Sequence, residues 1–126
     1  MARSLTRKGG LVYNYKATVV NVVDGDTLDC LIDLGFGIQV QQRVRLYGIN
    51  VYETTLRDDQ TPEEKLLGLE CKQYLVDLFI QGDPNIVIST YKGQGKYGRW
   101  LGVITFDETT DLAKHLREKG YERIKE

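Results

Sequence analysis

Histidine, cysteine and proline are all scarce in this chain of 126 residues, which contains one His, two Cys and two Pro. Cys30 and Cys71 lie far apart in the sequence, so zinc sites built from several cysteines and histidines are excluded. We expect two free thiols buried in the core of a protein from a reducing compartment, rather than one disulfide.

Long apolar runs and an excess of one charge are also missing. No stretch approaches the roughly 20 apolar residues that a membrane span requires, and the basic segment 1–8 is followed only by the short apolar stretch Leu11–Tyr13. We therefore expect no membrane anchor, no signal peptide and a cytoplasmic location. Lys and Arg number 17 and Asp and Glu 18, giving a formal charge of -1. This balance argues against binding nucleic acid through bulk positive charge, so any phosphate chemistry needs a local cluster.

Alternating apolar residues predict a single β-rich domain over residues 16–126, preceded by a flexible arm over residues 1–15. The arm contains two adjacent glycines and several basic side chains with little periodicity. The strand pattern begins at Lys16 and stops at Asp24–Gly25, which is a strong hairpin signal. Further strands are predicted at about 26–33, 38–47, 86–91 and 99–106.

Two helices are predicted around the later strands. Residues Thr61–Glu64 combine an N-cap threonine, a proline at the first helical position and a glutamate at the third. One apolar stripe follows at helical spacing, formed by Leu67, Cys71, Tyr74, Leu75 and Leu78. A short second helix is predicted at 111–119. The fold class is therefore α+β, mainly β, with the element order of a five-stranded Greek-key OB-fold barrel that has a helix between strands three and four.

Several charged residues lie where a site could form, although each has an ordinary interpretation. Asp24 and Asp26 flank a hairpin glycine, which indicates either a common turn or part of a site for a hard cation, since calcium and magnesium prefer carboxylate oxygens. Arg45 shares a strand face with a second arginine, and that face is either solvated or directed at an anion. Glu53 could be an ordinary loop carboxylate, and Arg99 could protect a strand edge.

Taken together, three segments resemble the staphylococcal nuclease (thermonuclease) family. They are Val-Val-Asp-Gly-Asp-Thr at 22–27, Arg-Val-Arg-Leu-Tyr-Gly-Ile-Asn-Val-Tyr-Glu at 43–53, and Lys-Tyr-Gly-Arg at 96–99. The second segment is similar to the family pattern R-L-x-G-I-D-x-P-E. The resemblance extends over roughly Tyr15 to Tyr121. It implies an OB-fold barrel and a calcium-dependent phosphodiesterase that cleaves DNA and RNA, leaving a 5′-hydroxyl and a 3′-phosphate.

The resemblance also implies roles for individual residues at the phosphate. Arg45 and Arg99 match the two arginines that grip the phosphate, and Glu53 matches the carboxylate that positions or deprotonates the attacking water. Lys96 and Tyr97 would lie beside a terminal phosphate of the bound strand. Independently of any family, two guanidiniums and a cation stabilise the negative charge that grows on a phosphodiester as water attacks it.

The implied calcium ligands are Asp26, Asn50 and the main-chain carbonyl of Val51, with Asp24 as a supporting acidic group. Asn50 stands where the family has an aspartate. We therefore expect weaker calcium binding, because affinity depends on the number of charged ligands. Val51 and Tyr52 replace a small residue and a proline, so the loop that leads to Glu53 lacks the restraint of a proline ring.

Three functional hypotheses stay open. The first is a calcium-dependent nuclease acting on DNA, RNA or both. The second is a weakened or inactive module of the same fold that binds nucleic acid or protein without cleaving, and Asn50 is its main support. The third is a structural component of a larger assembly. We favour a monomer, although no feature of the sequence bears directly on the oligomeric state.

Overall fold

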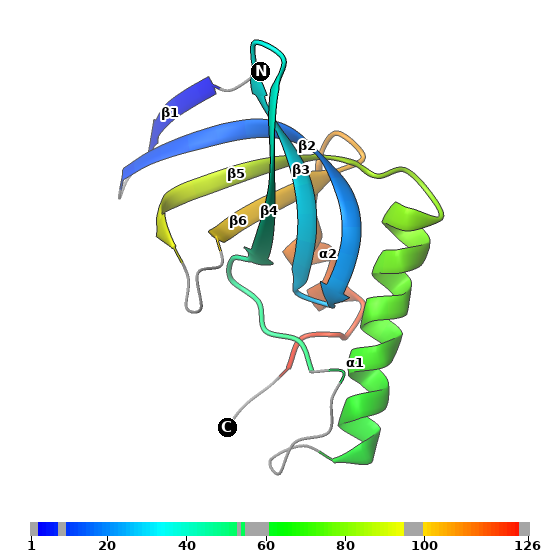
Figure 1. Ribbon diagram of the computed structural model, residues 1–126. Helices are drawn as coiled ribbons and strands as arrows, with labels where there is room; N and C mark the ends of the chain where they lie inside the picture. The colour runs from blue at the N-terminus through cyan, green and yellow to red at the C-terminus, as the bar shows by residue number, and fades with distance from the viewer. Residues whose placement is uncertain (1–2, 8–9, 53, 55–60, 95–99, 124–126) are drawn as a thin grey trace.

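Five strands close into a barrel in the computed structural model, which describes residues 3–7, 10–52, 54, 61–94 and 100–123 (Figure 1). The barrel strands are β2 (Gly10–Asp24), β3 (Thr27–Gly35), β4 (Ile38–Leu46), β5 (Asn85–Gln94) and β6 (Trp100–Phe106). The other elements are β1 (Arg3–Arg7), α1 (Pro62–Leu75), the π-helical turn η1 (Val76–Ile80), β7 (Thr110–Asp111) and α2 (Leu112–Glu118). The predicted class, mainly β with two helices, is confirmed.

The barrel is a mixed sheet that closes on itself. β2, β3 and β4 pair antiparallel in sequence order, and β4 then pairs parallel with β6 through Val44–Trp100 and Arg45–Leu101. β6 pairs antiparallel with β5, and β5 returns to β2. Closure leaves few unpaired strand edges, as in an OB-like barrel.

Strand pairing begins earlier than the sequence predicts. The sequence places the first strand at Lys16, after a flexible arm, but β1 pairs with the start of β2, and β2 pairs with β5 from Tyr13 onward. Regular structure therefore extends into the segment expected to be an arm. The partner of Tyr13 is Thr90, far along the chain. A partner at that separation leaves no trace in local periodicity, which explains the difference.

Helix α1 begins as the sequence predicts. The Thr61 side chain accepts a hydrogen bond from the backbone N–H of Glu64, and the Glu64 carboxylate accepts one from the Thr61 N–H (2.8 Å). This capping box satisfies N–H groups that the first turn cannot pair internally. Among the described residues, no helix combines the length and the apolar character needed to cross a membrane.

The face of α1 that packs on the core matches the predicted stripe except at its start, since Tyr74 and Leu78 are also packed against the core. Cys71 and Leu75 are buried as expected, but Leu67 is exposed. The helix continues into η1, where Phe79 is buried and meets Phe106 edge to face at a centroid distance of 5.9 Å. The fully buried residues Cys71, Leu75 and Phe79 are spaced four apart, and one turn before Cys71 the buried residue is Gly68 in place of Leu67.

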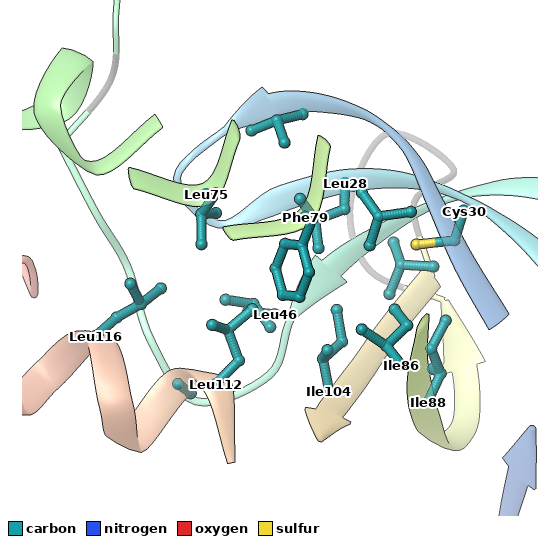
Figure 2. Close-up of a cluster of buried hydrophobic side chains, with 14 of the residues drawn as sticks. Leu28, Cys30, Leu46, Leu75, Phe79, Ile86, Ile88, Ile104, Leu112 and Leu116 are labelled. Atoms are coloured by element: carbon teal, nitrogen blue, oxygen red, sulfur yellow. The ribbon is translucent and has the colours of Figure 1, made fainter. Parts of the chain in front are cut away.

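The core fills the barrel and continues to both helices (Figure 2). Leu28, Cys30 and Ile32 of β3 are buried, so alternate residues of this strand form one apolar face. Both cysteines are buried free thiols, as predicted. Burial raises the pKa of each thiol to about 12. Asp26 precedes the apolar face of β3, and this position brings it to the rim of the barrel.

Candidate functional site

Asp26, Arg45 and Asn50 meet at the end of the barrel where β2 turns into β3. Asp26 lies in that turn, Arg45 is the penultimate residue of β4, and Asn50 lies in the loop that follows β4. One guanidinium nitrogen of Arg45, Nη2, lies 3.4 Å from Asp26 Oδ2 and also donates to Asn50 Oδ1. The side chains of Arg45 and Asp26 are only 19% and 13% exposed. The structure thus brings together three predicted site residues from separate segments.

Further contacts fix the Asp26 carboxylate. The Thr27 hydroxyl donates to Asp26 Oδ1 (3.0 Å), and the Val51 N–H donates to Asp26 Oδ2 (3.4 Å). The backbone carbonyl of Asp26 accepts from the Leu46 N–H (2.8 Å), which ties the turn to the end of β4. Thr27 is almost completely buried and has no role in the sequence-based interpretation. Threonine is common in strands, so its position beside Asp26 was the only available signal.

The loop that carries Asn50 is held by the segment after α2. Three contacts join them: the Arg117 guanidinium donates to the Gly48 carbonyl (2.8 Å), the Arg123 N–H donates to the Asn50 carbonyl (2.6 Å), and Val51 forms an antiparallel bridge with Glu122. Arg117 also forms an ion pair with Glu122 (3.0 Å). These contacts restrain the loop in the absence of the proline found in the family pattern. No local feature of the sequence reveals them.

Gly25, between the two aspartates, lies against helix α1. A Cβ atom at this position would lie 2.4 Å from Cys71 Sγ and 3.0 Å from Val51 Cγ2. The sequence correctly predicts a turn at Asp24–Gly25. The structural need for glycine is the close approach of the helix, since Gly25 is not among the glycines with positive φ. Besides burial, the negative charge of Asp26 also raises the Cys71 pKa.

Asp24 lies beside this network and supports the next part of the loop. Its Oδ1 accepts a hydrogen bond from the Thr54 hydroxyl (2.9 Å). Four predicted site residues lie outside the described residues: Glu53, Lys96, Tyr97 and Arg99. Their chain neighbours Thr54 and Trp100 are described, and Trp100 pairs with Val44 beside Arg45.

The structure separates the two arginines that the sequence places on one strand face. The Arg43 side chain is 54% exposed, and its Nε lies 2.9 Å from Asp29 Oδ1. The hydrogen bond from Arg43 lowers the pKa of Asp29. Arg43 is therefore part of a solvated surface pair, whereas Arg45 belongs to the network at the rim. The interpretation as a solvated face therefore applies to Arg43, and the interpretation as a face directed at an anion applies to Arg45, which contacts the Asp26 carboxylate.

The oxygen atoms at the rim fit a hard cation by type but not by number. Asp26 supplies a carboxylate and Asn50 an amide oxygen, and calcium usually takes six to eight oxygen ligands. Among the described residues, no group of three or more His, Cys, Asp or Glu side chains is arranged to hold a metal ion. The contact described for Val51 is its N–H on Asp26, and the positive charge of Arg45 lies beside both side-chain oxygens. The described residues at the rim therefore supply fewer oxygen ligands than calcium usually takes.

Comparison of the chain with protein-family models found no match, and comparison with curated proteins found none either. The resemblance to the thermonuclease family thus depends on the three sequence segments. The geometry around Asp26 and Arg45 is an independent basis for a functional interpretation.

Proposed function

We propose that this protein is a calcium-dependent nuclease of the thermonuclease type, which hydrolyses phosphodiester bonds in DNA, RNA or both. The observation that carries the proposal is the convergence of Asp26, Arg45 and Asn50 at one end of the barrel. The element order, with α1 between β4 and β5, supports the finer assignment of a Greek-key OB-fold.

Arg45 is the residue whose environment best suits a phosphate. Its Nη1 donates to the Leu46 carbonyl (3.0 Å), while Nη2 is shared between Asp26 and Asn50. A side chain held in this way loses less conformational freedom when it binds an anion. The planar guanidinium stays charged, and its rigid fork matches two phosphate oxygens better than the point charge of lysine does, once Nη2 exchanges Asp26 or Asn50 for the phosphate.

The remaining roles follow from the chemistry of phosphodiester hydrolysis. In this proposal Arg99 supplies the second guanidinium, and Lys96 and Tyr97 contact a terminal phosphate. Glu53 positions the attacking water, and general-base assistance of this kind typically contributes about 10²–10⁴-fold. Calcium on Asp26, Asn50 and the Val51 carbonyl would add positive charge at the phosphoryl oxygens. The interactions of the guanidiniums and of calcium with the phosphoryl oxygens strengthen as negative charge develops there, so they favour the transition state over bound substrate.

The direct test is cleavage of plasmid DNA and of an RNA oligonucleotide with millimolar calcium or with a chelator. Arg45→Gln should lower the rate at least about tenfold, because it removes a charge that stabilises the transition state. Arg43→Gln is the matched control: it changes the same residue type on the same strand, at a surface pair away from the rim. Its rate should equal that of the wild type. Equal rates in both variants would contradict the proposed site.

The residues outside the described ranges need their own variants. Glu53→Gln and Arg99→Ala should each lower the cleavage rate at least about tenfold while the circular dichroism spectrum stays unchanged. The products should carry 3′-phosphates, which a 3′-phosphatase assay detects. Products that carry 5′-phosphates instead would exclude the proposed mechanism.

A binding module without cleavage is the second candidate, and the engagement of Asn50 by Arg45 favours it. This contact uses an oxygen that the nuclease hypothesis assigns to calcium. Calorimetric titration separates the two: no heat with millimolar calcium, together with retained oligonucleotide binding, would identify a module. Asn50→Asp adds a charge beside Asp26, and it should raise calcium affinity and cleavage at least about tenfold if the wild type is a weakened enzyme.

A further inference from the structure

The hairpin formed by β3 and β4 extends beyond the closed part of the barrel. β2 pairs with β3 as far as Ile32, and β6 pairs with β4 only from Val44. Among the described residues, the part of the hairpin between these positions pairs only within itself. Figure 1 shows this segment in cyan, projecting past the other strands.

The tip of this hairpin presents apolar side chains to solvent. Phe36 is fully exposed (102%), and Leu34 and Ile38 on either side are exposed as well. Phe36 also has a φ of 55°, in the left-handed region that bulky residues rarely adopt. Its ring contributes to neither the turn nor the core of its own chain. An asparagine would suit this backbone better, so the ring points to a contact with another molecule.

An apolar cavity that could receive such a ring lies at the base of the same hairpin. Its volume is about 190 Å³, and it is lined mainly by Tyr15, Ile32, Leu34, Val40, Val44 and Trp100. Ile32 and Val44 are also residues of the buried core, so the cavity borders the core. An apolar cavity of roughly 150 Å³ admits benzene, so the volume here is sufficient for a phenyl ring.

The charge of the hairpin favours a second copy of this chain as the occupant. Residues 34–42, Leu-Gly-Phe-Gly-Ile-Gln-Val-Gln-Gln, contain no charged side chain. Of the two charged residues that flank them, Asp33 accepts the Gly35 N–H within the turn (2.8 Å) and Arg43 is paired with Asp29. A symmetric contact places the same surface on both sides, so a neutral surface avoids the repulsion of like charges. Anionic membranes and nucleic acids are recognised through Lys and Arg, which this stretch lacks.

We propose that two copies of the chain form a symmetric dimer by exchanging hairpin tips, with the Phe36 ring of each copy in the apolar cavity of the other. Leu34 belongs to both the tip and the cavity wall, so the ring that is inserted and the cavity that receives a ring are adjacent on one hairpin. A two-fold axis between the hairpins lets both insertions occur together, and the assembly closes at two copies. This interface is independent of the proposed nuclease activity.

Phe36→Asn is the variant that separates this contact from folding. Asparagine tolerates the left-handed backbone, so the variant should fold with an unchanged circular dichroism spectrum. Leu66→Gln is the matched control, since it removes an exposed apolar side chain on α1, away from the hairpin. Sedimentation should show dimers for the wild type and for Leu66→Gln. The dissociation constant of Phe36→Asn should rise about 100-fold or more.

Trp100 is the single tryptophan and lines the cavity, so its fluorescence reports whether the cavity is filled. Its emission should shift to shorter wavelength as wild-type concentration rises, and it should not shift for Phe36→Asn. A wild-type monomer at every concentration would overturn the proposal. So would a dimer that persists in Phe36→Asn, or a ladder of larger oligomers. Phe36-dependent binding to lipid vesicles without self-association would also overturn it.

Discussion

Replacing Gly25 with alanine tests whether the close approach of helix α1 holds the turn between Asp24 and Asp26. The new Cβ would lie 2.4 Å from Cys71 Sγ, 3.0 Å from Cys71 Cβ and 3.0 Å from Val51 Cγ2. Ordinary carbon contacts are about 3.5–4.0 Å, so the overlap is on the order of 1 Å with two buried side chains. Rotating the sulfur away leaves the contact with Cys71 Cβ, so the helix or the turn must move.

Overpacking of this kind costs typically about 1–3 kcal/mol, and contact with two buried residues places Gly25→Ala at the upper end. At roughly 3–4 °C per kcal/mol for a chain of this size, we expect the melting temperature to fall by about 10 °C. Thermal and urea unfolding, followed by circular dichroism, measure both quantities. The turn carries Asp26, so cleavage should also fall at temperatures where the variant is fully folded.

A double-mutant cycle with Cys71→Ala tests whether the contact with Cys71 causes the destabilisation by Gly25→Ala. Removing the sulfur eliminates the shortest contact, so the double variant should be more stable than the sum of the single effects by at least about 1 kcal/mol. Additive effects would refute the reasoning, because they would show that Gly25→Ala acts through the backbone of the turn and not through the helix.

Three further predictions concern pH and the contact between the helices. The Cys71 thiol, with its pKa raised from 9.0 to about 12, contributes stability that is present below pH 9 and lost as the pH rises toward 12. The stability difference between wild type and Cys71→Ala should therefore change by at most about 1.4 kcal/mol per pH unit in that range, and a constant difference would contradict this. The lowered pKa of Asp29 contributes stability above pH 3.8 that is lost as the pH falls below it, so acid unfolding of Asp29→Asn should converge with that of the wild type at low pH. Tyr74 OH is hydrogen bonded to His115 Nε2 between α1 and α2, and Tyr74→Phe should cost about 1 kcal/mol in urea unfolding. An unchanged midpoint would exclude that contribution.

The predicted and observed secondary-structure elements differ mainly where contacts with distant segments of the chain determine the structure. Local signals located the hairpin at Asp24–Gly25 and the start of α1 at Thr61, because turn and capping preferences depend on residues a few positions apart. The early start of β2 and the burial of Phe79 depend on partners far away in the chain. Local periodicity contains no information about such partners.

In the candidate site, too, some features were predicted from the sequence and others depend on tertiary contacts. Sequence motifs singled out Asp26, Arg45 and Asn50, and the structure places all three in one network. The motifs did not distinguish Arg45 from its neighbour Arg43, because residues two apart on a strand share a face. Only the curvature of the closed barrel and the path of the loop after β4 bring one arginine to the rim and leave the other on the surface.

The sequence by itself determined the strand pattern from residue 16 onward, the turn, the helix cap and the types of side chain available for chemistry, since each depends on local backbone preference and residue identity. Tertiary structure alone decided three things: that the helix packs too closely on Gly25 for any side chain, that Arg123 pairs with the Asn50 carbonyl, and that the hairpin tip stands outside the barrel. The physical reason is that these are contacts between segments brought together by barrel closure. Their energies depend on distances that no local stretch of sequence specifies.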